Sequence, residues 1–508
     1  MLTNAGQFLT ERAKISATME AWVDLASGER TTFREANARA NRIAHVLLAQ
    51  GLAAGDRVAA LMSNTPLHAE SYYASAKAGC IFVELNWRLS VPELAYQILD
   101  SGASVVLHGA DQANLVGPLR EQFPAVRWID MDRAETRQRI AAAPADEPPI
   151  RATLEDPLWM MYTSGTTGRP KGALMSHRAS VAWLSSMMAT ADVHLGDRQI
   201  VVAPLFHIAG LGMTMVAVCR GMSTVLLRSF DPGAMWEVIE REQIDGFFAV
   251  PAILGAMWAH PKRQTARAEC LRWVVCGAAP VPVTLIEAYA TKGIDIHQVY
   301  GATETHGGIC LMTAEHAKRK VGSTGLPYFG IDVRVVDRTG SDVPPGVPGE
   351  VITRGPHLIT SYWNLPEATR ESIRDGWFHT GDIAEVDEDG FIYIKDRSKD
   401  MVISGGENVY PAEVENVLLS HPGVREVAVI GQPSARWGEC SCAVIVAADD
   451  WKHRPAELTE ALKVHVRDRL ARYKQPRAYE YIDALPLNPS GKVLKRILRE
   501  RFPGPAPE

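Results

Sequence analysis

The chain has 508 residues, of which 46% are hydrophobic and 22% are charged, and its formal net charge is −6. This length predicts two or three domains, and the composition excludes collagen, a coiled coil or a largely disordered chain. The acidic balance disfavours sequence-independent nucleic-acid binding, since that function needs a broadly basic surface. We therefore expect no nucleic-acid partner.

The cysteines indicate a reduced compartment, because the seven of them include no CxxC pair and no zinc-ligand spacing. The first residues lack the continuous apolar stretch of a signal peptide. No uncharged apolar run reaches the roughly 18 residues that a membrane-spanning helix needs. We expect a cytoplasmic protein with no transmembrane segment, and a homodimer remains an open alternative.

The first part of the chain alternates helix and strand signals. Apolar spacing predicts a helix over 34–50, and a short buried strand over 58–62 follows it. Residues 90–93 (SVPE) are typical of a capping box with a proline in the first helical turn, and a strand is predicted over 105–107. Such alternation predicts layered α/β structure with substantial parallel sheet.

The pattern changes to a smaller unit after Asp396. Two strands and two helices are predicted between Pro411 and Leu470, and about 110 residues of α+β structure suffice for an independent domain. We therefore predict an N-terminal domain over residues 1–395 and a C-terminal domain over residues 396–508.

The most informative segment follows an apolar strand predicted at 158–161. Glycines let backbone N–H groups approach a polyphosphate, hydroxyls donate hydrogen bonds, and a lysine adds a positive charge. The residues that would grip the phosphates are Thr163, Ser164, Gly165, Thr166, Thr167, Gly168 and Lys171. The spacing does not fit the Walker A pattern, which disfavours an ordinary P-loop NTPase; a polar surface turn is the other interpretation.

This loop resembles the signature of the adenylate-forming superfamily, which includes acyl-CoA synthetases, luciferases and peptide-synthetase adenylation domains. Further motifs of the superfamily follow in order over most of the chain, at 204–207 (PLFH), 276–280 (CGAAP), 300–304 (YGATE), 349–350 (GE), 376–382 (GWFHTGD), 396–400 (DRSKD), 405–411 (GGENVYP) and 489–492 (PSGK). The resemblance implies a large N-terminal domain of several subdomains with layered sheets and helices. It also implies a small, mobile α+β C-terminal domain that rotates about a hinge at Asp396.

The resemblance implies how ATP is held. Tyr300 offers an aromatic face for adenine, Asp382 accepts the ribose hydroxyls, and Arg397 reaches the ribose and phosphate side. The remaining nucleotide contacts are expected from Gly277, Ala278, Ala279, Gly301 and Thr303. A simple turn at Asp382 and a surface salt bridge at Arg397 are the plainer interpretations.

The magnesium ion that accompanies ATP is expected at Glu304, whose carboxylate is a hard oxygen ligand. The hydroxyl of Thr163 is the second candidate ligand. Taken alone, an acidic residue after a threonine is more often a helix cap, and only the surrounding motif favours the metal role.

Lys492 is the residue expected to act in adenylation. Attack of a carboxylate on the α-phosphate builds up negative charge, and a positioned ammonium stabilises that charge. Thr303 and Glu304 are also assigned to catalysis, and His207 is expected to gate the acyl pocket. A buried core position is the plainer interpretation of His207, and a solvated helix start that of Lys492.

The second half-reaction needs a thiol to reach the acyl adenylate. In the superfamily the small domain rotates and replaces the lysine with the loop of Gly405, Gly406 and Glu407. Adjacent glycines suit a strand edge beside a pantetheine arm, and a plain β-bulge is the alternative. Trp437 resembles a residue near the CoA channel of acyl-CoA synthetases, although it could equally serve domain packing.

The acyl pocket is expected from segments 206–213, 247–251, 278–279 and 303–309. They hold many small residues and no lysine or arginine, so a dicarboxylate has no counter-charge. They also lack an aspartate for an amino-acid ammonium. Small apolar walls leave room for a bulky or long hydrophobic acid, which favours a medium- or long-chain fatty acid. Aryl acids of the ferulate or coumarate type are the alternative.

The leading hypothesis is an ATP-dependent acid–CoA ligase that uses ATP, Mg²⁺ and CoA, forms an acyl-AMP intermediate, and releases AMP and pyrophosphate. Loading of a carrier protein is the alternative within the superfamily, but no Gly-Gly-x-Ser attachment site is present. A luciferase-like monooxygenase has no support in the sequence. A non-catalytic nucleotide-binding protein is disfavoured by an intact set of charged residues: Lys171, Glu304, Asp382, Arg397 and Lys492.

Overall fold

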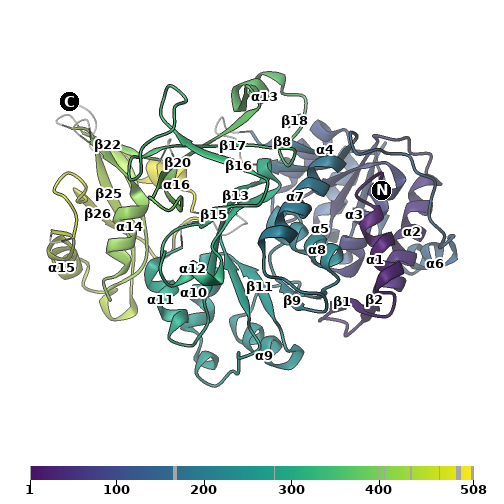
Figure 1. The fold of residues 1–508 in the computed structure, drawn as a ribbon, viewed down its shortest axis with the longest axis horizontal. Coiled ribbons are helices and arrows are strands. Elements are labelled where there is room, and N and C mark those ends of the chain that lie inside the picture. Colours follow the sequence, from purple (N-terminus) through teal and green to yellow (C-terminus); the bar gives the residue numbers. More distant parts are fainter. Residues whose placement is uncertain are drawn as a thin grey trace.

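The computed structural model describes residues 2–504 apart from 164–168, 280, 398–399, 405–406, 435–436, 468 and 488–492. Its described strands form four sheets, and in Figure 1 the C-terminal sheet lies at the left, in light green and yellow. The described helices are α1 (Gln7–Ile15), α2 (Phe33–Leu48), α3 (Pro66–Ala78), α4 (Val91–Ser101), α5 (Ala113–Gln122), α6 (Ala134–Ala142), α7 (His177–Thr190), α8 (Ile208–Arg220), α9 (Pro232–Glu242), α10 (Pro251–Ala259), α11 (Val283–Ala290), α12 (Ala314–Ala317), α13 (Pro366–Ser372), α14 (Pro411–Leu419), α15 (Pro455–Arg467) and α16 (Lys495–Arg501).

Short 3₁₀ helices complete the helical elements: η1 (Ala110–Gln112), η2 (Pro261–Gln264), η3 (Thr303–Thr305) and η4 (Asp449–Trp451). The capping box expected at the start of α4 is present, because the Ser90 N–H donates to Glu93 Oε2 at 2.8 Å. Helix α2 corresponds to the helix predicted over 34–50. No helix in the described part of the chain is both long enough and apolar enough to cross a bilayer.

One large sheet has seven strands in the order β18 (Ser361–Tyr362), β8 (Lys171–Ser176), β7 (Pro157–Thr163), β4 (Ile81–Glu84), β3 (Arg57–Leu61), β5 (Val105–His108) and β6 (Arg127–Asp130). Strands β7, β4, β3, β5 and β6 run parallel. The apolar runs of β4 and β5 are buried on both faces, as parallel strands covered by helices require.

The other large sheet has nine strands in the order β15 (Leu326–Pro327), β14 (Gly307–Leu311), β13 (Ile296–Ala302), β12 (Trp273–Cys276), β11 (Gly246–Ala249), β9 (Arg198–Val201), β10 (Ser223–Leu226), β1 (Glu20–Asp24) and β2 (Arg30–Thr32). Buried residues of α2, α3, α7 and α8 join strands of both large sheets in one hydrophobic cluster. The layered α/β architecture expected from the sequence is therefore confirmed.

A third sheet consists of β16 (Asp332–Val336), β17 (Gly349–Arg354), β20 (Trp377–Val386) and β19 (Ile373–Arg374), with β21 (Ile392–Arg397) paired to β20. The fourth sheet belongs to the C-terminal part of the chain and consists of β23 (Glu407–Val409), β22 (Val402–Ser404), β25 (Gly438–Ala447) and β24 (Val424–Ser434), with β26 (Ala478–Tyr481) paired to β25. Helices α14 and α15 cover that sheet through a separate cluster of buried apolar residues.

Candidate active site

The predicted phosphate loop joins two antiparallel strands. Strands β7 and β8 form a hairpin in which Thr163 and Lys171 are paired, so these two residues close the base of the connection. The expected loop residues Ser164, Gly165, Thr166, Thr167 and Gly168 lie outside the described residues. The structure therefore places the two ends of the loop.

Glu304 lies beside Thr163 although the two residues are far apart in the sequence. The Thr163 hydroxyl donates a hydrogen bond to Glu304 Oε1 at 3.2 Å, and the Tyr362 hydroxyl donates to the same oxygen at 2.9 Å. The backbone carbonyl of Glu304 accepts from the Ile359 N–H at 3.0 Å. The Lys171 Nζ lies 5.1 Å from the centroid of the Tyr362 ring. A carboxylate, two hydroxyls and an ammonium thus gather at the base of the loop.

Tyr300 and Asp382 form a second group near the first. The Tyr300 hydroxyl donates to Asp382 Oδ2 at 2.8 Å, and burial raises the pKa of Tyr300 well above its usual value, so the phenol stays protonated. Asp382 is the backbone partner of Arg397 on neighbouring strands. The turn before Asp382 is fixed by the Glu350 carboxylate, which accepts from the Gly381 N–H at 3.1 Å.

The remaining predicted nucleotide contacts lie at the ends of strands β12 and β13. Gly277 is required by close backbone approach, because an added Cβ would lie 2.5 Å from the Val299 carbonyl oxygen. Ala278 is exposed and adopts a φ of 66°, which non-glycine residues rarely do. Ala279 is half-buried, and Gly301 and Thr303 stand on either side of the β13 terminus.

His207 and Arg88 lie near each other at the start of one predicted acyl segment. His207 stands at the N-cap position of α8 without a capping hydrogen bond from its side chain, and burial and the neighbouring Arg88 charge lower the pKa of His207 to about 4. The imidazole is therefore neutral, and its Nε2 has no hydrogen-bond partner in the described part of the chain. The Arg88 guanidinium lies 5.1 Å from the Trp87 ring centroid and 5.9 Å from that of Phe206.

Asp396 links the two parts of the chain. It belongs to β21, and its Oδ2 accepts a hydrogen bond from the Ala412 N–H in the first turn of α14, at 3.0 Å. Lys495 forms a 2.8 Å ion pair with Glu415 on the same helix. Although burial opposes its charge, the carboxylates of Glu415 and Asp396 raise the pKa of Lys495. Helix α16 is thereby attached to the segment where the hinge is predicted.

The C-terminal candidates are only partly described. Trp437 is 38% exposed, and the Arg477 guanidinium lies 5.8 Å from its ring centroid. The backbone of Arg397 lies within β21, whereas Gly405, Gly406 and Lys492 lie outside the described residues. Trp437 and Arg477 form an accessible aromatic and basic pair.

The donor set around Glu304 fits a magnesium ion. Mg²⁺ is bound in nucleotide-dependent enzymes by one or two protein oxygen ligands together with substrate phosphates and water. The Glu304 carboxylate and the Thr163 hydroxyl supply oxygen donors at the base of the phosphate loop. These two residues would hold the ion, which would neutralise phosphate charge during adenylation.

Two participants escaped the sequence reasoning. Tyr362 reaches Glu304 because β18 pairs with β8. In the sequence Tyr362 lies 58 residues after Glu304, and no local pattern connects the two. Arg88 lies near Phe206 although it belongs to the loop after β4, outside the predicted acyl segments. In both cases strand order, rather than local pattern, creates the contact.

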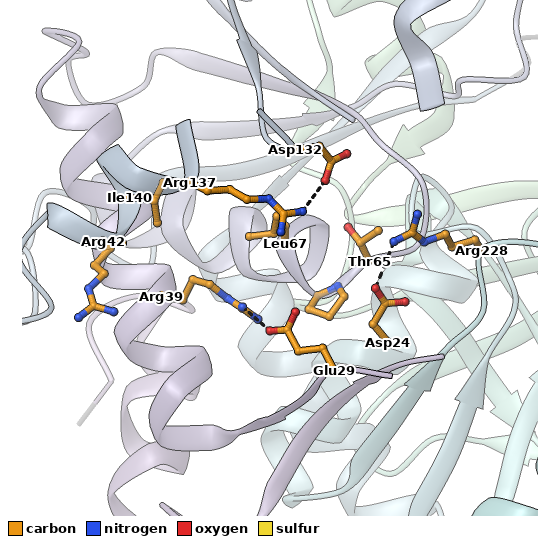
Figure 2. Close-up of a pocket in the computed structure, with 12 residues that line it drawn as sticks. Asp24, Glu29, Arg39, Arg42, Thr65, Leu67, Asp132, Arg137, Ile140 and Arg228 are labelled. Atoms are coloured by element: carbon orange, nitrogen blue, oxygen red, sulfur yellow. Dashed lines mark hydrogen bonds and ion pairs between the residues drawn. The ribbon is translucent and has the colours of Figure 1, made fainter. Parts of the chain in front are cut away.

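A cavity lined by other residues is shown in Figure 2. This 230 Å³ cavity is bordered by the N-terminus of α3 and by helices α2 and α6. Three of its arginines already pair with carboxylates: Arg39 with Glu29, Arg137 with Asp132, and Arg228 with Asp24. The ion pairs account for most of the charge in this cavity.

Buried histidines make the fold sensitive to acid. Burial lowers the pKa of His306 to about 3 and that of His177 and His357 to about 4. Histidines of the unfolded chain have a pKa near 6.5 and therefore bind more protons between these values. The free energy of unfolding should fall as the pH falls from about 6.5 toward 4, by at most about 1.4 kcal/mol per pH unit for each histidine.

Urea unfolding between pH 7.5 and 4.5 measures this slope. The His177→Gln variant should have a shallower slope than the wild type, because one group that takes up a proton on unfolding is missing. A midpoint that does not change between pH 7 and pH 5 would contradict the prediction.

Comparisons with known proteins show the family of this chain. The AMP-binding enzyme family matches residues 9–363, and the AMP-binding enzyme C-terminal domain matches residues 413–492. The chain therefore belongs to the AMP-binding enzyme family. The expected adenylate-forming superfamily and the expected enzyme class, an AMP-forming acyl-CoA synthetase, are both confirmed.

Individual relatives span the whole chain. It is 43% identical to a feruloyl-CoA synthase of Amycolatopsis, over 98% of this chain and 99% of that protein. It is 42% identical to the long-chain-fatty-acid–CoA ligase FadD13 of Mycobacterium tuberculosis, over the full length of both. The solved structure of a Mycobacterium tuberculosis fatty acyl CoA synthetase is 40% identical and superposes with a TM-score of 0.79 over 98% of each chain.

Proposed function

We propose that this ligase activates a hydrophobic carboxylic acid, with a medium- or long-chain fatty acid as the leading substrate and an aryl acid as the second. A carboxylate oxygen attacks the α-phosphorus of ATP and expels pyrophosphate, which gives the acyl adenylate. The CoA thiol, after losing its proton, then attacks the acyl carbon and expels AMP. The relatives named for long-chain fatty acids and for ferulate support these two substrate classes.

The observation that carries the proposal is the double contact made by one short segment. Tyr300 contacts Asp382 at the end of β13, and Glu304 contacts Thr163 four residues later. A nucleoside held at the first contact would present its phosphates to the second. The segment continues into Gly307 and Gly308, which belong to the expected acyl pocket.

The test is AMP release with ATP, Mg²⁺ and CoA over fatty acids of graded length and a panel of aryl acids. A maximum among fatty acids supports the leading substrate class, and a maximum among aryl acids supports the second. Turnover that does not depend on CoA would favour loading of a carrier protein. Absence of AMP release with every acid would contradict the proposal.

CoA binding is expected to use Trp437. The Trp437→Ala variant should raise the KM for CoA about tenfold, since stacking on an aromatic side chain contributes about 1–3 kcal/mol. Acid-dependent ATP–pyrophosphate exchange, which needs no CoA, should not change.

Trp451→Ala is the matched control for this prediction. Trp451 also stacks against an arginine of the C-terminal part, at 4.8 Å from Arg454, but lies in η4. Equal KM values for CoA in the wild type and the Trp437 variant would argue against the assignment.

A further inference from the structure

Helix α7 contacts the segment that follows Glu304 through two polar side chains. Ser180 and Trp183 lie nearly one turn apart on the buried face of this helix. The Ser180 hydroxyl lies 3.0 Å from Nε2 of His306, and the Trp183 indole N–H donates to the Gly308 carbonyl at 2.9 Å. Trp183 is therefore fixed in position by a hydrogen bond to strand β14.

The indole fills the space left by small residues on two other elements. A Cβ added at Gly212 of α8 would lie 3.4 Å from Cη2 of Trp183, and one added at Gly307 of β14 would lie 3.3 Å from Cζ2. The Trp183 ring centroid lies 5.4 Å from that of His306. Only 4% of Trp183 is exposed. Trp183 thus occupies the space that the small residues Gly212 and Gly307 leave beside them.

Trp183 lies where the tail of the substrate acid is expected to extend. Gly307 and Gly308 begin three residues after Glu304, which stands at the phosphate end of the site. Ile208, the residue after His207, lies next to Gly212 and Gly307, as Trp183 does. An acid whose carboxylate reaches the α-phosphate must extend its tail among these elements.

We propose that Trp183 determines the length of the acid that this ligase accepts, by closing the acyl pocket between α7, α8 and β14. This inference rests on the proposed function. The indole is too large to share this space with an acyl tail, and its hydrogen bond to Gly308 resists displacement. Acids that end before the indole are accepted, and longer acids are rejected because they require the ring to leave its place.

The experiment compares kcat/KM over saturated fatty acids of graded length and over aryl acids of graded size in the wild type and two variants. Trp183→Ala should move the optimum to longer acids, with a gain of about tenfold or more for each methylene newly accommodated. Trp183→Phe, which loses the N–H but keeps most of the ring volume, should retain the wild-type cut-off. The KM for ATP should not change in either variant.

Trp236→Ala is the matched control. Trp236 is also fully buried and donates its indole N–H to a carbonyl, that of Met257 at 3.0 Å, but it belongs to α9 and to a different core cluster. Its loss should lower stability without moving the length optimum. If Trp183→Ala does not fold, Trp183→Leu supplies the same measurement with a smaller loss of volume.

Binding of acyl sulfamoyl adenosines of graded length, followed by thermal shift, gives a readout that does not depend on turnover. A length profile of unchanged shape in the Trp183→Ala or Trp183→Leu variant would overturn the inference. The same change of the preferred acid length in Trp236→Ala would also overturn it. A wild type that releases AMP with no acid in the panel contradicts the proposed function instead. The two failures are therefore distinguishable.

Discussion

Replacing Glu304 by glutamine is expected to lower the rate of adenylation by about 10²–10³-fold, the usual cost of removing one electrostatic contact to a developing charge. The amide keeps the shape of the side chain and one oxygen, but it removes the negative charge that would hold Mg²⁺. Thr163 and Tyr362 both donate to Oε1, so the side-chain position should be retained in the variant. ATP–pyrophosphate exchange measured against Mg²⁺ concentration checks the prediction.

Two further variants separate the effect of the Glu304 charge from the effect of the hydrogen bonds that position its carboxylate. Tyr362→Phe removes one hydrogen bond to the carboxylate, worth about 1.5 kcal/mol, so its rate should fall by only about tenfold. Glu315→Gln changes an exposed carboxylate on the following helix and should leave the exchange rate unaltered. A Glu304→Gln enzyme with wild-type exchange at low Mg²⁺ would remove the metal assignment.

Local patterns predicted the elements of the fold, whereas contacts between distant segments had to come from the structure. The capping box at Ser90 needs only four neighbouring residues, and it is formed as expected. The hydrogen bond between Thr163 and Glu304 spans 141 residues, and only the superfamily motifs brought these two residues into one hypothesis. Motif knowledge therefore supplied the long-range information that propensity and periodicity lack.

Pocket shape was the part of the site that the sequence did not reveal. The small residues Gly212 and Gly307 were read as open walls, because a list of lining segments does not show what faces them. Trp183 comes from a helix outside those segments and joins Gly308 across 125 residues. Trp183 fills the space next to Gly212 and Gly307, and the composition of the lining segments does not show that neighbour.

Replacing Lys492 by alanine is expected to lower the rate of adenylation, the first half-reaction, strongly and to change the second half-reaction little. The superfamily resemblance implies that its ammonium stabilises the charge that builds up when the acid attacks the α-phosphate. Loss of that contact should slow adenylation by about 10²–10³-fold or more. The reaction of CoA with a preformed acyl adenylate should be largely spared, because the resemblance implies that the small domain presents another loop in that step.

The two half-reactions can be measured separately, by ATP–pyrophosphate exchange and by CoA consumption with synthetic acyl adenylate. Lys463→Ala is the control, since Lys463 is an exposed lysine of the same part of the chain and, among the described residues, forms its ion pair with Glu460 on its own helix. Lys495, three residues after Lys492, is held by Glu415 and is therefore unsuited to replace the lost ammonium. Equal losses in both half-reactions would indicate a structural role for Lys492, and an unchanged exchange rate would require another cation at the α-phosphate.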